Sequence, residues 1–107
     1  MFKKLLIAGL FVTSTANAAF YTGNDLYNKL TSSDSSDRIL GMGYIAGIYD
    51  VFDGSSICAK QNVTLGQLKD IVIKKLAEKP EYRHMTADNF VYVALSEAFP
   101  CPKKKNT

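Results

Sequence analysis

The chain has 107 residues, of which 13 are basic and 10 are acidic, with only two cysteines and one histidine. A formal net charge of +3 is too small to indicate a nucleic-acid-binding protein, and so few sulfur and imidazole ligands argue against a metal protein. The length predicts one small domain with a thin hydrophobic core.

The first 18 residues, MFKKLLIAGLFVTSTANA, have the three parts of a secretory signal peptide. Lys3 and Lys4 precede a short apolar run, and small residues ending in Ala16-Asn17-Ala18 form an A-x-A cleavage site. The apolar run is well short of the roughly 20 residues that span a bilayer, which argues against a membrane anchor. We therefore predict export and cleavage after Ala18, which lowers the formal net charge to +1.

The exported part is predicted to be a helical domain over residues 19–102 and a basic tail over residues 103–107. Asn24 is a candidate N-cap for a short helix that runs to Leu30. A polar segment over residues 31–37 separates it from a longer apolar helix, predicted from about Asp37 to Phe52. The sequence Asp53-Gly54-Ser55-Ser56 then predicts a turn.

The second half of the chain has clearer helix boundaries. Thr64 and Gln67 have the spacing of a capping box, and the helix that they start is predicted to end before Pro80. Thr86 precedes a last helix, which Pro100 ends. Alternation typical of strands is scarce, so the predicted fold is all-α, a small bundle of about four helices with one disulfide.

The disulfide is predicted between Cys58 and Cys101, since two cysteines in an oxidising compartment usually pair. It would close a loop of about 43 residues, worth roughly 4 kcal/mol on the chain-entropy model. A metal site and a redox pair are the alternatives. Both have less support, because His84 is the only histidine and no C-x-x-C spacing occurs.

Two glycines in the long helix, Gly43 and Gly47, are four residues apart and therefore share one face. Each costs the helix roughly 0.5–1 kcal/mol relative to alanine, so a compensating role is expected. We predict that they form a helix-packing groove for a neighbouring helix. A ligand groove is the alternative, although the apolar flanking residues offer few polar groups to a ligand.

An enzyme would need a reacting group, and the sequence offers weak candidates. His84 is isolated in a charged loop, and Asp50 and Asp53 are more typical of a solvated helix end than of an acid–base pair or a cation site. The serines of residues 32–36 lack a G-x-S-x-G context. We therefore predict no catalytic residue, no metal ligand and no cofactor.

Three stretches taken together resemble the Rap/Tai family of immunity proteins, which is associated with bacterial type VI secretion. They are FYTGNDLYNKL, GYIAGIYD and ICAKQNVTLGQLKDIVIKKLAEKPEYRHMTADNFVYVALSEAFPC, and they cover Phe20 to Cys101. The resemblance implies an all-helical, often dimeric periplasmic protein that binds and blocks a peptidoglycan-cleaving amidase from a neighbouring cell. A small periplasmic stress chaperone, or a structural binding protein without a toxin partner, is the alternative function.

Many members of the family have a second cysteine pair, and the matching positions here are Leu30 and Gly41. Cys58 and Cys101 match the other cysteine pair of the family, which this chain retains. We predict that Leu30 contacts the Gly41 surface in place of the missing bond, and its burial would contribute about 1.5–3 kcal/mol.

An inhibitor that blocks a cleft needs an accessible element with anchoring side chains, and the connection KPEYRHMT from Lys79 to Thr86 is the best candidate. Pro80 restricts its backbone, and Tyr82 and Arg83 are residue types enriched in interface hot spots. The alternative is that Tyr82 covers the end of the bundle while Arg83 faces water. The predicted partner-binding residues are Glu81, Tyr82, Arg83, His84 and Met85.

Overall fold

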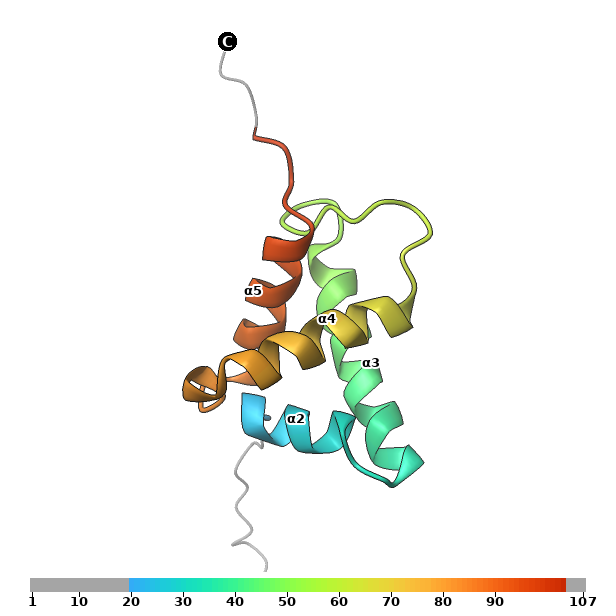
Figure 1. Cartoon of the computed structure of the whole chain (residues 1–107). Helices are drawn as coiled ribbons and strands as arrows, with labels where there is room; N and C mark the ends of the chain where they lie inside the picture. Colours follow the sequence, from blue (N-terminus) through green and yellow to red (C-terminus); the bar gives the residue numbers. More distant parts are fainter. Residues whose placement is uncertain (1–19, 104–107) are drawn as a thin grey trace, which may run out of the picture.

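The computed structural model describes residues 20–103, which form a bundle of four α-helices. They are α2 (Gly23–Leu30), α3 (Ser35–Phe52), α4 (Leu65–Glu78) and α5 (Ala87–Ala98), with a short 3₁₀ helix η2 (Pro80–Tyr82) between the last two. In Figure 1, α3 and α5 run in roughly the same direction, while α2 and α4 run across them. The all-α prediction is confirmed. The predicted signal peptide lies outside the described residues, as does all of the basic tail except Lys103.

Side-chain caps fix where the helices begin. The predicted capping box at α4 is confirmed, because the Thr64 hydroxyl accepts from the Gln67 amide at 3.1 Å and the Gln67 side chain accepts from the Thr64 amide at 2.8 Å. The first helix begins differently from the prediction. Its N-cap is Thr22 and not Asn24, since Thr22 and Asp25 form the same reciprocal pair of hydrogen bonds.

The long helix α3 begins two residues earlier than predicted. Asp34 is its N-cap, and its carboxylate accepts from the Ser36 amide at 2.9 Å and from the Ser36 hydroxyl at 2.8 Å. These hydrogen bonds lower the pKa of Asp34 because they favour its ionised form. The polar segment that separates the first two helices is therefore shorter than the sequence indicates.

All four helices contribute to one hydrophobic core. Its buried side chains include Leu26 of α2, Ile45 of α3, Val72 and Leu76 of α4, and Leu95 of α5. Ile57, in the loop between α3 and α4, is also fully buried. Within the part of the chain that the structure describes, every helix is too short or too polar to cross a bilayer.

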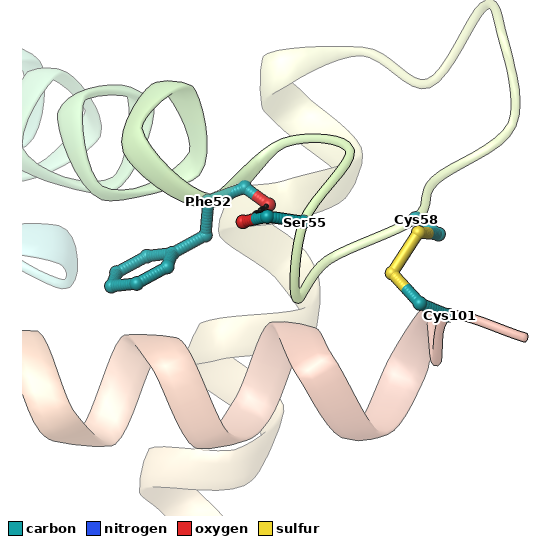
Figure 2. The surroundings of a disulfide bond; sticks show 4 residues. All are labelled: Phe52, Ser55, Cys58 and Cys101. Carbon is teal, nitrogen blue, oxygen red and sulfur yellow. Dashed lines mark hydrogen bonds between the residues drawn. A yellow bond between two sulfur atoms is a disulfide. The ribbon is translucent and has the colours of Figure 1, made fainter. Parts of the chain in front are cut away.

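Cys58 and Cys101 form a disulfide, with their Cα atoms 4.9 Å apart. Figure 2 shows the bond joining the loop after α3 to the chain just beyond α5, beside the turn that contains Phe52 and Ser55. The amide of Cys58 also donates to the carbonyl of Phe99 at 2.8 Å. A covalent bond and a hydrogen bond thus hold this loop against the C-terminal end of α5.

The closest glycine contact in α3 is at Gly41. A methyl group there would lie 2.7 Å from Leu30 Cδ2, closer than two carbon atoms can approach, and Leu30 is only 3% exposed. The predicted contact between Leu30 and Gly41 is therefore confirmed. Here the missing side chain allows α2 to approach α3 closely.

The prediction that Gly43 and Gly47 form a packing groove for a neighbouring helix of the same chain is wrong. Both glycines are exposed, and a methyl group at either would meet nothing within 4 Å. They lie on the outer side of α3, together with Ile39, Leu40 and Val51, whose side chains are 66%, 56% and 70% exposed. The spacing placed both glycines on one face correctly, but that face points away from the bundle.

We expect Gly41→Ala and Gly47→Ala to change stability in opposite directions. Gly47→Ala should raise the free energy of unfolding by about 0.5–1 kcal/mol, because the methyl group improves helix propensity without a clash. Gly41→Ala should lower it, because overpacking against Leu30 typically costs about 1–3 kcal/mol. Urea denaturation at a protein concentration that keeps the chain monomeric would measure both changes. Equal effects of the two substitutions would contradict this account.

Candidate functional site

The connection between α4 and α5, residues 79–86, is a series of tight turns. The Tyr82 amide donates to the Lys79 carbonyl at 3.0 Å, the Arg83 amide to the Pro80 carbonyl at 3.2 Å, and the Met85 amide to the Tyr82 carbonyl at 3.0 Å. Figure 1 shows this orange segment at the edge of the bundle, where α4 ends. Its backbone conformation is therefore defined by its own hydrogen bonds.

The same segment is fixed to the beginning of α2. The first amides of a helix have no partner within the helix, and here two of them donate to the connection. The Gly23 amide donates to the Met85 carbonyl and the Asn24 amide to the Arg83 carbonyl, both at 2.8 Å. A methyl group on Gly23 would lie 2.9 Å from the Arg83 oxygen, so a side chain at that position would prevent this approach.

Arg83 points inward. Its Nε donates to the Leu76 carbonyl at 2.7 Å, and its guanidinium carbon lies 4.3 Å from the centre of the Tyr27 ring. In a continuing helix the Leu76 carbonyl would accept from residue 80, but Pro80 has no amide hydrogen. The arginine supplies the donor that the proline removes. Arg83 therefore links α4 to α2, in contrast to the alternative in which its side chain simply faces water.

The neighbours of Arg83 are more accessible. Tyr82 is 50% exposed, Glu81 and His84 are exposed, and Met85 is half-buried. The structure thus exposes three of the five predicted partner-binding residues, Glu81, Tyr82 and His84, and leaves Arg83 and Met85 half-buried, with Arg83 facing inward. Sequence alone gave no sign of this division, because the contacts of Arg83 are with residues on two other helices.

A cavity of about 260 Å³ lies beside this segment, between α4 and α5. The residues that line it are Lys75, Lys79, Tyr82, Met85, Phe90, Val93 and Glu97. Lys75 Nζ lies 2.8 Å from Glu97 Oε1, and that hydrogen bond and charge raise the pKa of Lys75. The sequence contains no sign of this cavity, and Val93 on its wall is 37% exposed.

The candidate chemical groups are scattered. Asp50 and Asp53 are both exposed near the end of α3, and His84 lies in the connection after α4. Across residues 20–103, no three histidine, cysteine, aspartate or glutamate side chains gather closely enough to hold a metal ion. We infer that the candidate functional site is the accessible part of the connection together with the adjoining cavity.

We expect Arg83→Ala to destabilise the fold by about 1–3 kcal/mol, because it leaves the half-buried Leu76 carbonyl without its donor and removes the contact with Tyr27. Arg83→Lys is the matched control for charge, since lysine keeps the cation but lacks the planar guanidinium. Arg83→Lys should therefore recover only part of the stability that Arg83→Ala loses. Thermal unfolding would measure both variants, and an unchanged melting temperature for Arg83→Ala would contradict the structural role.

A comparison with protein families agrees with the resemblance seen in the sequence. The model of the family described as Rap1a immunity proteins matches residues 22–101, which include all four helices and both cysteines. No curated protein matches the chain. Because the match covers most of the chain and the whole described bundle, the chain belongs to the family of Rap1a immunity proteins.

Proposed function

We propose that this protein is a periplasmic immunity protein that binds and inhibits a peptidoglycan-cleaving amidase of the type VI secretion system. The observation that carries this proposal is the family match over residues 22–101. An immunity protein of this kind acts by binding an effector protein and needs no reactive group of its own. The resemblance of the three sequence stretches supports both the amidase target and the periplasmic location, and the signal-peptide pattern in residues 1–18 supports export.

The accessible part of the connection after α4 is the proposed contact surface for the effector. Its carbonyls at Arg83 and Met85 already accept from α2, so the segment would lose little conformational entropy when a partner binds. Tyr82 combines a large half-exposed ring with a hydroxyl group, which is the character of a binding hot spot. The segment thus offers a rigid backbone with an exposed anchor.

Tyr82→Ala should weaken binding to the cognate amidase by at least about 2 kcal/mol, the usual hot-spot threshold, and leave the melting temperature nearly unchanged. Tyr82→Phe should retain most of the affinity, because it keeps the ring. Leu65→Ala is a control at an exposed position of α4 outside the segment. Titration calorimetry with the purified amidase would measure the affinities, and wild-type affinity in folded Tyr82→Ala would place the contact elsewhere.

The resemblance also implies a homodimer, and we include this state in the proposal. The outer side of α3 supplies apolar surface for it, because Ile39, Leu40 and Val51 are exposed around Gly43 and Gly47. Exposed aliphatic side chains beside two glycines would allow another helix to approach closely. Contact with such a partner would also offset the loss of helix stability that the two glycines cause.

Sedimentation equilibrium at micromolar concentration should therefore give twice the mass of the mature chain. Leu40→Lys should shift the equilibrium towards monomer, because it places a charge on the apolar surface. Lys74→Ala, at an exposed position of α4, is the control and should stay dimeric. A monomeric wild-type protein would contradict the homodimer, whereas an unaffected Leu40→Lys dimer would place its interface on another surface.

A further inference from the structure

The cavity between α4 and α5 has an apolar interior. Phe90, which is 5% exposed, belongs to the hydrophobic core, and Met85 and Val93 add further apolar wall. An apolar cavity of about 150 Å³ is large enough to hold benzene, so the 260 Å³ here can receive an aromatic or branched aliphatic side chain. Because one side of the cavity is formed by the exposed Tyr82 and Val93, such a group can enter from outside.

The residues that line the cavity also carry more positive than negative charge. Lys75 and Lys79 both line it, whereas Glu97 is its only acidic lining residue. Glu97 is paired with Lys75 at 2.8 Å. Lys79 is exposed, and its ammonium group has no carboxylate within 4.0 Å among the described residues. The cavity therefore offers one cationic group that a ligand could neutralise.

The position of the cavity walls is set by contacts already described. Tyr82 and Met85 belong to the connection after α4, and the Gly23 amide holds the Met85 carbonyl at 2.8 Å. Phe90 and Val93 project from α5, and Lys75 from α4. Because regular helices and a hydrogen-bonded turn provide these walls, the cavity exists before any ligand arrives, and binding requires little reorganisation.

We propose that this cavity seats an apolar side chain of the effector whose neighbouring carboxylate pairs with Lys79. An uncharged apolar group would fill the interior but leave the lysine unused, and a cationic group would be repelled by it. The proposal rests on the proposed function for the identity of the partner. It goes further by naming the chemistry of the partner's anchor, an aromatic or branched aliphatic side chain next to an acidic group.

N-acetyl-L-phenylalanine is a suitable probe, because it carries a benzyl group beside a carboxylate. Titrated to millimolar concentration into the ¹⁵N-labelled oxidised protein, it should shift the amide resonances of Tyr82, Met85 and Val93 in a saturable way. N-acetyl-L-phenylalaninamide, which lacks the carboxylate, should bind about two- to fivefold more weakly, the range expected for one exposed ion pair. Absence of saturable shifts at the cavity, or equal affinity for the two probes, would overturn the proposal.

Two variants separate the charge from the apolar surface. Lys79→Gln should make the affinities for the two probes equal, because it removes the proposed partner of the carboxylate. Val93→Glu should weaken binding of N-acetyl-L-phenylalanine more than that of the amide, because it places a negative charge on the cavity wall. Leu65→Glu is the matched control, since Leu65 is also 37% exposed but lies at the start of α4, outside the cavity. A preference for the carboxylate that survives Lys79→Gln would also overturn the proposal.

The probe experiments need no effector, so they are independent of the amidase titrations. Binding of the probes without binding of any peptidoglycan amidase would contradict the proposed function but support the chemistry of the cavity. Tight amidase binding that is unaffected by Val93→Glu, in a protein shown to be folded by circular dichroism, would overturn the role of the cavity and leave the proposed function standing.

Discussion

The surface around the connection after α4 depends on one hydrogen bond, between Arg83 Nε and the Leu76 carbonyl. Pro80 ends the helix efficiently but cannot donate to that carbonyl, and a buried carbonyl without a partner costs about 1–3 kcal/mol. The arginine meets this need from three residues beyond the proline and stacks on Tyr27 of α2 as it does so. For Arg83 to reach the Leu76 carbonyl, the chain turns back after Pro80, and Tyr82 in this turn is exposed. A requirement of helix termination thus sets the orientation of the exposed anchor.

Local sequence patterns predicted the elements well, because the interactions that define them lie within a few residues. The Thr64–Gln67 capping box and the helix end before Pro80 were both identified correctly. The Thr22–Asp25 pair was missed, since its acidic residue is Asp and the expected pattern has Glu or Gln. The contact between Leu30 and Gly41 was predictable only through the family resemblance, because the two residues come from different helices.

The orientation of α3 and the role of Arg83 could not be predicted for a common reason. Apolar residues occur on almost every side of α3, so its periodicity does not distinguish the buried face with Ile45 from the outer face with Leu40 and Val51. Similarly, Tyr82 and Arg83 are adjacent and both suit an interface, but only Arg83 has partners on α2 and α4. In each case the deciding contact is between elements far apart in the sequence. The cavity was missed for the same reason.

The two ends of α5 are fixed in different ways, and this arrangement suits a small domain with a thin core. At its C-terminal end the disulfide holds the loop that contains Cys58, and at its N-terminal end the amide of Ala87 donates to the Tyr21 carbonyl at 2.8 Å. A helix of 12 residues is about 18 Å long, so these attachments are far enough apart to contribute almost independently to stability. The covalent bond therefore stabilises the fold as a whole, whereas hydrogen bonds to α2 and α4 define the shape of the proposed binding surface. A loss of overall stability need not change that shape, provided that the Arg83 contacts remain.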